Sequence, residues 1–354
     1  MPKPIPPVTV AASIPPDFER TYFEECDRYP FSSRAVAFHP ANAWWMAEAS
    51  LAAYGAFEET APRKLDLSRL LAVGFRIEAR TRGEMQFLVI ENAEVLIIAF
   101  RGTRLEGFNI PFFNGQAFTA NWRDVITDAR FTPSLIATDT FVHAGFHQAF
   151  QTIESDLDAL IQRALSDQRP VWFCGHSLGG ALATLAAHKY RDRAQGLYTF
   201  GSPRVGNASF ARILDERLPN IHRFVHHRDI VTTVPPERFT LPASIQGWKE
   251  IFHNLRSSVS AGYTHTGKLK YISGGKTWKI EDGISAEVSL TALAADALVH
   301  AKEIADVLAQ HASLADPGSW PVLYDAIVDH SPVYYANKLF NACEEVFAGH
   351  PTFE

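Results

Sequence analysis

The feature of this 354-residue sequence that most constrains its fold is a short run near the middle of the chain. The apolar residues 171–174 precede Gly175-His-Ser177-Leu-Gly179, and a helical pattern rich in alanine and leucine follows. A Gly-x-Ser-x-Gly turn between a buried strand and a helix holds its serine in strained backbone angles, so the hydroxyl stands at the carboxyl edge of the sheet. The flanking glycines lack a Cβ atom, which lets strand and helix pass closely. We therefore interpret Ser177 as a candidate nucleophile.

The order of the apolar segments predicts an α/β fold. Segments 74–80, 85–91 and 95–100 have strand patterns, and the third is apolar throughout, which is typical of a strand covered on both faces. Strands and helices then alternate, which predicts a mostly parallel central sheet with helices on both faces. No internal repeat or linker divides the chain, so we expect one domain spanning residues 1–354. The other predicted elements are helices at 40–57, 144–166, 178–193 and 208–217, and strands at 171–174, 196–200, 221–227 and 268–272.

Three segments lie outside this pattern. Residues 1–17 are rich in proline, which predicts an N-terminal segment that is either extended or loosely ordered. Residues 105–119 form a loop rich in large apolar side chains, and residues 274–316 have the apolar spacing of an inserted helix with one apolar face. The loop carries Phe108, Ile110, Phe112, Phe113 and Phe118.

Composition argues against several classes of protein. A net charge of −6 provides no basic surface for nucleic acid, and no apolar run is long enough for a transmembrane segment. The N-terminal residues lack the apolar core of a secretory signal peptide, and three cysteines do not suggest a disulfide framework. We therefore expect a cytoplasmic protein; a secreted form, exported without a leader or with its leader removed, is the alternative. The sequence carries no signal for a cofactor or for the oligomeric state.

A serine hydroxyl needs a base, and the base needs a carboxylate that orients it. In folds with this turn, the partners follow in the order serine, acid, histidine. Asp229 comes just after the predicted strand 221–227, where such loops collect, whereas Asp215 lies inside a predicted helix. Two later histidines fit the order, His265 and His330, and the pattern favours His330 only slightly. We predict no metal site, because alternation in a strand points His226 and its neighbour to opposite faces.

The negative charge that develops on the carbonyl oxygen of an acyl-transfer substrate needs two hydrogen-bond donors. The backbone N–H of Leu178, the residue after the serine, is one candidate. The other is expected from the loop after strand 95–100, where Thr103 offers its N–H and its hydroxyl.

Seven motifs occur in an order that resembles the class 3 lipases, the fungal-type triacylglycerol lipases of the α/β-hydrolase fold. The resemblance covers about residues 40–340 and is more specific than the serine turn alone. It implies Ser177, Asp229 and His330 as the catalytic triad, with His330 taken from the family's Asp-His signature. The motifs are Phe100-Arg-Gly-Thr103, Asn121-Trp-Arg-Asp124, Val142-His-Ala-Gly-Phe146, Gly175-His-Ser-Leu-Gly-Gly-Ala181, Thr199-Phe-Gly-Ser-Pro-Arg-Val-Gly-Asn207, His227-Arg-Asp229 and Asp329-His-Ser-Pro-Val-Tyr334.

The same resemblance implies the activity of the site. It implies Thr103 and Leu178 as the oxyanion hole, residues 105–119 as a lid that contacts substrate, and an acyl-enzyme route to acylglycerol hydrolysis at an oil–water or membrane interface. The chain departs from the family in a longer lid segment and in the 274–316 insertion, which widens the spacing from acid to base. A phospholipase A1, an esterase of soluble esters and a catalytically silent binding module remain the alternatives.

Overall fold

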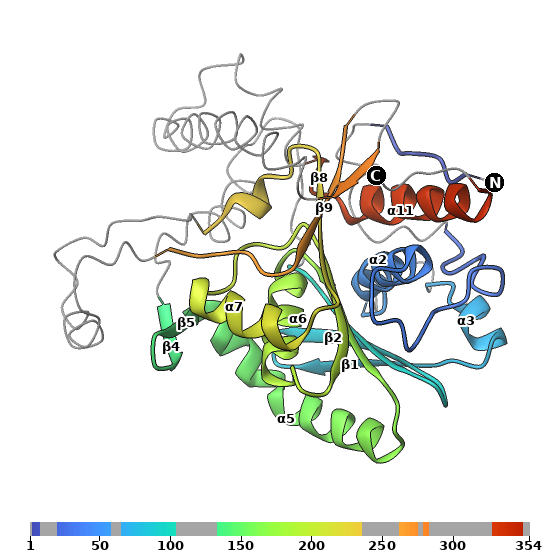
Figure 1. Ribbon diagram of the computed structural model, residues 1–354. Helices are drawn as coiled ribbons and strands as arrows, with labels where there is room; N and C mark the ends of the chain where they lie inside the picture. Colours follow the sequence, from blue (N-terminus) through green and yellow to red (C-terminus); the bar gives the residue numbers. More distant parts are fainter. Residues whose placement is uncertain are drawn as a thin grey trace, which may run out of the picture.

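The computed structural model is built around an eight-stranded sheet, which runs through the middle of Figure 1. The residues that the structure describes are 2–7, 20–57, 65–103, 133–235, 262–274, 279–282 and 328–349. Within them, the strand order is β1-β2-β3-β6-β7-β8-β9-β10. The strands are β1 (Arg76–Arg82), β2 (Met85–Glu91), β3 (Leu96–Phe100), β6 (Val171–His176), β7 (Ala194–Phe200), β8 (Ile221–His226), β9 (Lys268–Ile272) and β10 (Ile280–Asp282).

Five neighbouring strands, from β3 through β6, β7 and β8 to β9, pair in parallel. β1 and β2 extend the sheet antiparallel to β3, and β10 pairs antiparallel with β9 at the other edge. The sheet is therefore mostly parallel, as predicted, and its parallel strands share one carboxyl edge. A hairpin of β4 (Pro133–Ala137) and β5 (Thr140–His143) and the strand β10 are not among the predicted elements. β10 spans only three residues, too few for a periodic pattern.

Helices cover both faces of the sheet, which confirms the predicted α/β-hydrolase arrangement (Figure 1). The alternation of side chains along each strand explains the two layers. In β3, Ile97 belongs to one apolar core and Ile98 to the other. One face carries α2 (Pro40–Gly55) and α11 (Pro332–Phe347), and the other carries α5 (Ala144–Ser166), α6 (Leu178–Lys189) and α7 (Ala208–Arg217). The short elements are α3 (Ser68–Ala72) and the 3₁₀ turn η1 (Ile230–Thr233).

α2 and α11 pack together on one face of the sheet. Trp44 and Trp45 of α2 are fully buried, and burial of each large apolar side chain contributes about 1.5–3 kcal/mol. Arg20 joins the two helices, because it donates to Glu48 of α2 through Nε at 2.9 Å and to Asn337 of α11 at 2.5 Å. The position of α11 relative to the sheet therefore depends on both apolar packing and a buried polar network.

The N-terminal residues 2–7 lie along α11. The Lys3 N–H donates to Asn341 Oδ1 at 2.6 Å, and Asn341 Nδ2 donates back to the Lys3 carbonyl at 2.9 Å. Asn337 Nδ2 donates to the Pro4 carbonyl at 2.8 Å. Of the two alternatives predicted for this proline-rich segment, the bonds to α11 favour the extended one for residues 2–7.

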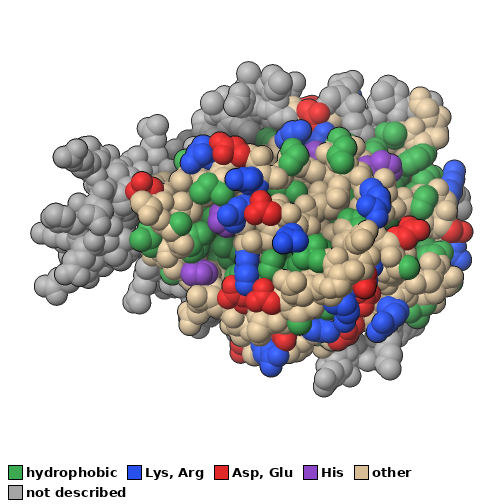
Figure 2. Space-filling model, turned by 60° about the horizontal axis from the view of Figure 1, so that its bottom comes forward, with side chains coloured by type: hydrophobic (Ala, Val, Ile, Leu, Met, Phe, Trp, Pro, Cys, Tyr) green, Lys and Arg blue, Asp and Glu red, His purple; other side chains and the backbone are tan. Residues whose placement is uncertain are grey.

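The surface around α5 carries charges of both signs. Acidic and basic side chains lie next to one another on the face shown in Figure 2. Arg82 of β1 pairs with Asp156 at 2.7 Å, and Lys189 at the end of α6 pairs with Glu154 at 2.6 Å. Exposed pairs of this kind contribute about 0–1 kcal/mol each. The two apolar cores, rather than these pairs, hold the layers together.

Two predicted segments fall largely outside the described residues. The loop 105–119 lies wholly outside them, and of the 274–316 segment only Gly274 and residues 279–282 are described. The single domain of 1–354, with this loop and this insertion, therefore stays a prediction. Among the described helices, none combines the length and the apolar composition that crossing a membrane requires.

Candidate active site

Ser177 has the backbone conformation that the turn motif predicts. It lies between β6 and α6 with φ 59° and ψ −129°, a region that side-chain-bearing residues rarely occupy and that costs about 1–3 kcal/mol. Its N–H donates to the Phe200 carbonyl at the end of β7 (3.0 Å), and its carbonyl accepts from the Gly180 N–H (2.9 Å). The strain at Ser177 is therefore maintained by bonds to the neighbouring strand and helix.

The flanking glycines permit the close approach of β3, β6 and α6. A Cβ atom on Gly175 would lie 2.2 Å from the backbone of Gly179, and one on Gly179 would lie 2.1 Å from the Phe100 carbonyl oxygen. Neither position has room for a side chain. The structure thus confirms the role predicted for both glycines.

The loop after β3 passes against the serine turn. A Cβ atom on Gly102 would lie 2.0 Å from the Tyr54 hydroxyl and 2.8 Å from the His176 carbonyl oxygen. Thr103 follows, and its hydroxyl is buried without a hydrogen-bond partner among the described residues. Leu178 begins α6, where backbone N–H groups have no intrahelical acceptor. The two donors predicted for an oxyanion therefore come from adjoining segments.

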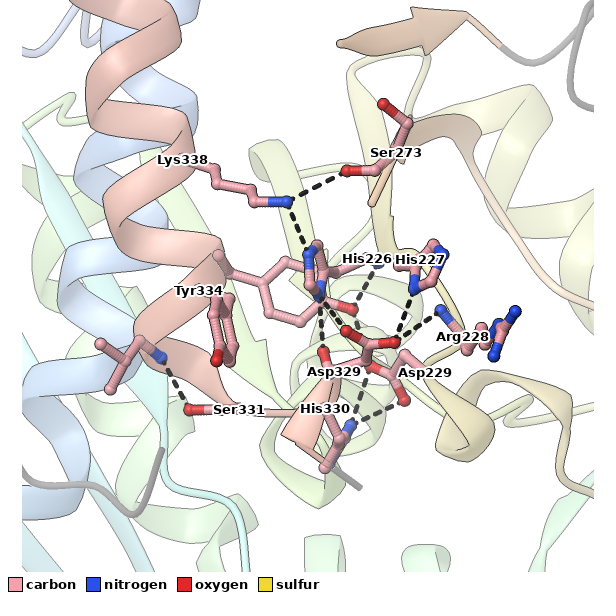
Figure 3. A network of polar contacts seen from close by, with 12 residues as sticks. His226, His227, Arg228, Asp229, Ser273, Asp329, His330, Ser331, Tyr334 and Lys338 are labelled. Carbon is pink, nitrogen blue, oxygen red and sulfur yellow. Dashed lines mark hydrogen bonds and ion pairs between the residues drawn. The ribbon is translucent and has the colours of Figure 1, made fainter. Parts of the chain in front are cut away.

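Asp229 and His330 form a buried pair at the same edge. His330 Nδ1 lies 2.8 Å and 2.9 Å from the two carboxylate oxygens of Asp229 (Figure 3). Because an ionised carboxylate only accepts, Nδ1 carries the proton, and the lone pair of the neutral ring is on Nε2. The Asp229 carboxylate also accepts from the Val231 N–H at 3.0 Å and the Tyr335 hydroxyl at 2.7 Å. This arrangement suits a base whose ring is oriented by a carboxylate.

Local sequence explains where both partners lie. Asp229 caps η1 three residues after the end of β8, and Ser331, the residue after His330, caps α11 with Pro332 at its first position. Gly201, with φ 55°, ends β7 against the pair. A Cβ atom there would lie 2.5 Å from Asp229 Oδ2 and 2.9 Å from His330 Nδ1. Since Ser177 bonds to the residue before Gly201, serine turn and Asp–His pair meet at the end of β7.

The two alternative residues have other partners. Asp215 on α7 accepts from the Gly267 N–H at 2.8 Å and so holds the loop before β9. His265 donates from Nε2 to the Thr232 carbonyl at 2.7 Å, and burial keeps its pKa well below the usual range. Both contacts support loops, whereas Asp229 and His330 contact each other.

His176 is a residue of the site that the sequence argument misses. The turn motif is expected to point it away from the site. Instead its Nε2 donates to the His330 carbonyl at 2.6 Å, and the two rings lie 4.4 Å apart. Its Nδ1 accepts from the Tyr54 hydroxyl at 2.7 Å. Burial, and then the neighbouring His330, lower the pKa of His176 far enough that the ring is neutral near pH 7.

Tyr335 is the second residue that the sequence argument misses, because the matched motif ends one residue earlier, at Tyr334. Tyr335 donates to Asp229, while the Tyr334 ring stacks on His226 with centroids 5.3 Å apart. The helical turn decides which of two adjacent tyrosines faces the carboxylate. The predicted lid residues Phe108, Ile110, Phe112, Phe113 and Phe118 lie outside the described residues.

A strained serine between a parallel strand and a helix, at the sheet edge that also holds a buried Asp–His pair, defines an α/β-hydrolase fold. Residues 97–239 match the family described as Lipase (class 3). Over these residues the chain is similar to the class 3 lipases, the family that its motifs indicate.

Three comparisons describe what the chain is similar to. It is 34% identical over 142 residues to a lipase of Rhizopus niveus, which is 37% of this chain and 36% of the relative. It is 31% identical over 165 residues to secreted mono- and diacylglycerol lipase 1 of Fusarium solani, which is 46% of this chain and 43% of the relative. The solved structure of lipase II from Rhizopus niveus has a TM-score of 0.49 at 24% identity, over 68% of this chain and 84% of that one. The matches thus span less than half the length of the two curated relatives, the Rhizopus niveus lipase and the Fusarium solani lipase.

The expected cytoplasmic location is contradicted by these relatives. The similar proteins from Fusarium solani and Malassezia globosa are named secreted lipases. The cysteine count was a poor guide to the compartment. A chain of this length buries enough apolar surface to be stable without disulfides, so their scarcity does not indicate reducing surroundings.

Proposed function

We propose that this protein is a serine carboxylic-ester hydrolase that cleaves acylglycerols, with Ser177 as nucleophile, His330 as base and Asp229 as the orienting acid. The observation that carries the proposal is the strained Ser177 at the edge where Asp229 bonds His330 Nδ1. A serine in an ordinary turn would not need the strain, and a structural histidine would not need a carboxylate that is itself held by Tyr335. Relatives that are named lipases support acylglycerols as the substrate.

In the first half of the reaction, Ser177 Oγ attacks the ester carbonyl carbon and His330 Nε2 accepts the hydroxyl proton. The oxygen of the tetrahedral intermediate is negatively charged, and the Leu178 N–H and Thr103 donate to it. The intermediate then expels the alcohol, which takes the proton from His330, and leaves an acyl group on Ser177. Asp229 holds the imidazole in the required tautomer throughout.

In the second half, a water molecule loses a proton to His330 Nε2 and attacks the acyl carbonyl. The same donors stabilise the second tetrahedral intermediate, and His330 returns the proton to Ser177 as the carboxylic acid leaves. No other group is required, because the base is regenerated in each half.

We also propose that residues 105–119 act as the lid of this site. In the sequence they begin two residues after Thr103, a residue of the proposed oxyanion hole. An apolar lid would open more readily where an oil–water interface offers its apolar face a second environment. A rate that rises as tributyrin passes its solubility limit would support the lid, and a smooth hyperbola through that limit would count against it.

Labelling with a fluorophosphonate tests the proposed nucleophile. The wild-type protein is expected to be labelled once and to lose activity in step, whereas Ser177→Ala should resist labelling and stay folded. Ser50→Ala is a matched control, because Ser50 is a buried serine of α2 that bonds the Met46 carbonyl. An unlabelled wild-type protein would favour a silent binding module.

A substrate panel tests the proposed specificity. We expect triacylglycerols to be hydrolysed faster than phospholipids and than p-nitrophenyl esters of short acids. Preference for phospholipids would indicate a phospholipase A1 instead, and preference for soluble esters a simple esterase.

A further inference from the structure

The two loops that supply the acid and the base are joined by a second Asp–His pair. The segment after β8 contributes His227 and Asp229, and the segment before α11 contributes Asp329 and His330 (Figure 3). Asp229 bonds His330, and Asp329 Oδ2 lies 2.8 Å from His227 Nδ1. The two segments are therefore joined by two carboxylate–imidazole pairs of opposite direction. Only the first belongs to the proposed triad.

Three consecutive residues at the end of β8 donate to Asp329. His226 Nδ1 donates to the Asp329 carbonyl oxygen at 2.9 Å. His227 Nδ1 and the Arg228 N–H donate to the carboxylate at 2.8 Å and 3.2 Å. The next residue on one segment is Asp229, and the next on the other is His330. The bonds to Asp329 thus set the register in which acid and base face each other.

Lys338 of α11 stabilises the contact between His226 and Asp329. It is buried, and its Nζ donates to His226 Nε2 at 2.8 Å and to the Ser273 carbonyl at 3.0 Å (Figure 3). Because His226 Nδ1 already donates to a carbonyl, Nε2 of the neutral ring must accept. Burial and the nearby Lys338 lower the pKa of His226 to about 4, so the ring is neutral near pH 7. Lys338 therefore stabilises the one tautomer that can hold Asp329.

We propose that Asp329 is a positioning residue for His330, with His227 and Lys338 as its supports. This inference rests on the proposed function. Asp329 touches no reacting atom; it fixes the main chain one residue before the base. A displacement of the base by about 1 Å can cost about 100-fold in rate. The geometry of the Asp229–His330 pair is accordingly expected to depend on a carboxylate outside the triad.

The main test removes the Asp329 carboxylate with one variant and keeps a single oxygen acceptor with a second. Asp329→Ala is expected to lower kcat on a soluble p-nitrophenyl ester by about 10- to 100-fold, with KM changed by less than about 2-fold. Asp329→Asn keeps an oxygen acceptor and should recover several-fold of the loss. Removing His227 from Asp329→Ala should add little, since the pair is already broken. Lys338→Met should cost less than Asp329→Ala, because it acts through His226.

Glu91→Ala is the matched control. Glu91 is a buried carboxylate that accepts from Arg163 and Arg169, and it lies at the opposite edge of the sheet. Its loss should lower Tm and leave kcat unchanged. If Asp329→Ala keeps wild-type kcat, or if Glu91→Ala lowers kcat equally at an equal loss of Tm, Asp329 has no positioning role.

A second measurement separates this inference from the proposed function. The Nδ1 proton of His330, held between nitrogen and carboxylate, should give a downfield proton NMR resonance that His330→Gln removes. Asp329→Ala is expected to shift or broaden it, and Glu91→Ala to leave it in place. An unmoved resonance in Asp329→Ala overturns the inference even in an inactive protein. If the resonance shifts in Asp329→Ala but the wild-type protein hydrolyses no ester, only the proposed ester-hydrolase function is contradicted.

Discussion

Nε2 of His176 donates to the backbone carbonyl of His330 at 2.6 Å, while Nδ1 of the same ring accepts from the Tyr54 hydroxyl at 2.7 Å. The residue before the proposed nucleophile thereby bonds the backbone of the proposed base. Because Tyr54 belongs to α2, the helix layer on one face of the sheet is joined to the edge where the reaction is proposed.

Tyr54→Phe should lower both stability and turnover. The change leaves the buried Nδ1 of His176 without its donor, and an unsatisfied buried group costs about 1–3 kcal/mol. We expect that loss in the free energy of unfolding from urea titration, together with a decrease in kcat. Tyr190→Phe, which removes the hydroxyl bonded to Asp158, is the control and should leave kcat unchanged. Equal kcat in the two variants would show that His176 does not support the base.

Tyr335→Phe should slow the reaction without unfolding the protein. The phenol donates to Asp229 Oδ2 at 2.7 Å, and a hydrogen bond to a charged group contributes about 1.5–3 kcal/mol. If half of that free energy is expressed in the transition state, kcat falls about 4- to 12-fold. Steady-state kinetics on a soluble ester measures the effect. Tyr334→Phe, whose ring stacks on His226 rather than facing the carboxylate, should retain most activity, and the reverse ranking would refute the assignment.

Gly201→Ala should inactivate by displacing the Asp–His pair. Its Cβ atom would meet Asp229 and His330 within 3 Å, whereas a Cβ on Gly74 would meet nothing within 4 Å. Both glycines have a positive φ, so Gly74→Ala carries only the backbone cost of about 1–2 kcal/mol. We expect Gly74→Ala to lose some stability with normal kcat, and Gly201→Ala to lose activity as well. Normal activity in Gly201→Ala would place the working pair elsewhere.

The identity of the base can be tested with two histidine variants. His330→Ala should lower kcat by about 10⁴-fold or more, because no group then accepts the Ser177 proton. His265→Ala should cost stability, since the Thr232 carbonyl loses its donor, but should retain turnover. Kinetics and Tm of both proteins decide the matter. A folded, fully active His330→Ala protein would exclude the proposed mechanism.

Stability should fall as the pH drops below about 6.5. Burial lowers the pKa of His188 and of His226 to about 4 and that of His222 to about 3 in the folded protein. Between these values and the ordinary pKa of 6.5, the unfolded chain binds protons that the folded protein excludes. Each such histidine therefore removes about 1.4 kcal/mol of stability per pH unit as the pH decreases through that window.

His188→Gln isolates one of these contributions. The variant removes a titrating ring that stacks on Phe210, so it should lower stability at pH 7. Between about pH 6 and pH 4.5, its urea-derived free energy of unfolding should fall less steeply than that of the wild type, by about 1.4 kcal/mol per pH unit. Parallel curves for the two proteins would show that His188 is not buried in its neutral form.

Periodic apolar patterns predicted the main elements well. The helix 144–166 and the strands 85–91 and 268–272 have the predicted bounds. The helix after Ser177 ends at Lys189 rather than 193, and the strand before Asp229 ends at His226, one residue early. The end residues of a helix or strand depend on tertiary contacts that interrupt its backbone hydrogen bonds, and a local sequence pattern does not contain this information.

The pairing of acid and base is not local. His265 and His330 both follow Asp229 in the chain, and the pattern hardly distinguishes them. The two histidines differ in their partners. His265, just before β9, bonds a carbonyl of η1, whereas His330, just before α11, bonds Asp229. The same helix selects Tyr335 over Tyr334 and brings Lys338 to His226.

The sequence by itself determined the serine turn, the order of strands and helices and the α/β class, because sterics and periodicity act between residues close in the chain. Gly175 is needed by the geometry of the turn itself, because a Cβ atom there would meet the backbone of Gly179, four residues further along the chain. Only the tertiary structure decided that His176 bonds the His330 backbone and that Asp329 pairs with His227. These contacts join segments about a hundred residues or more apart, and their hydrogen bonds exist only once α2, α11 and the sheet have packed.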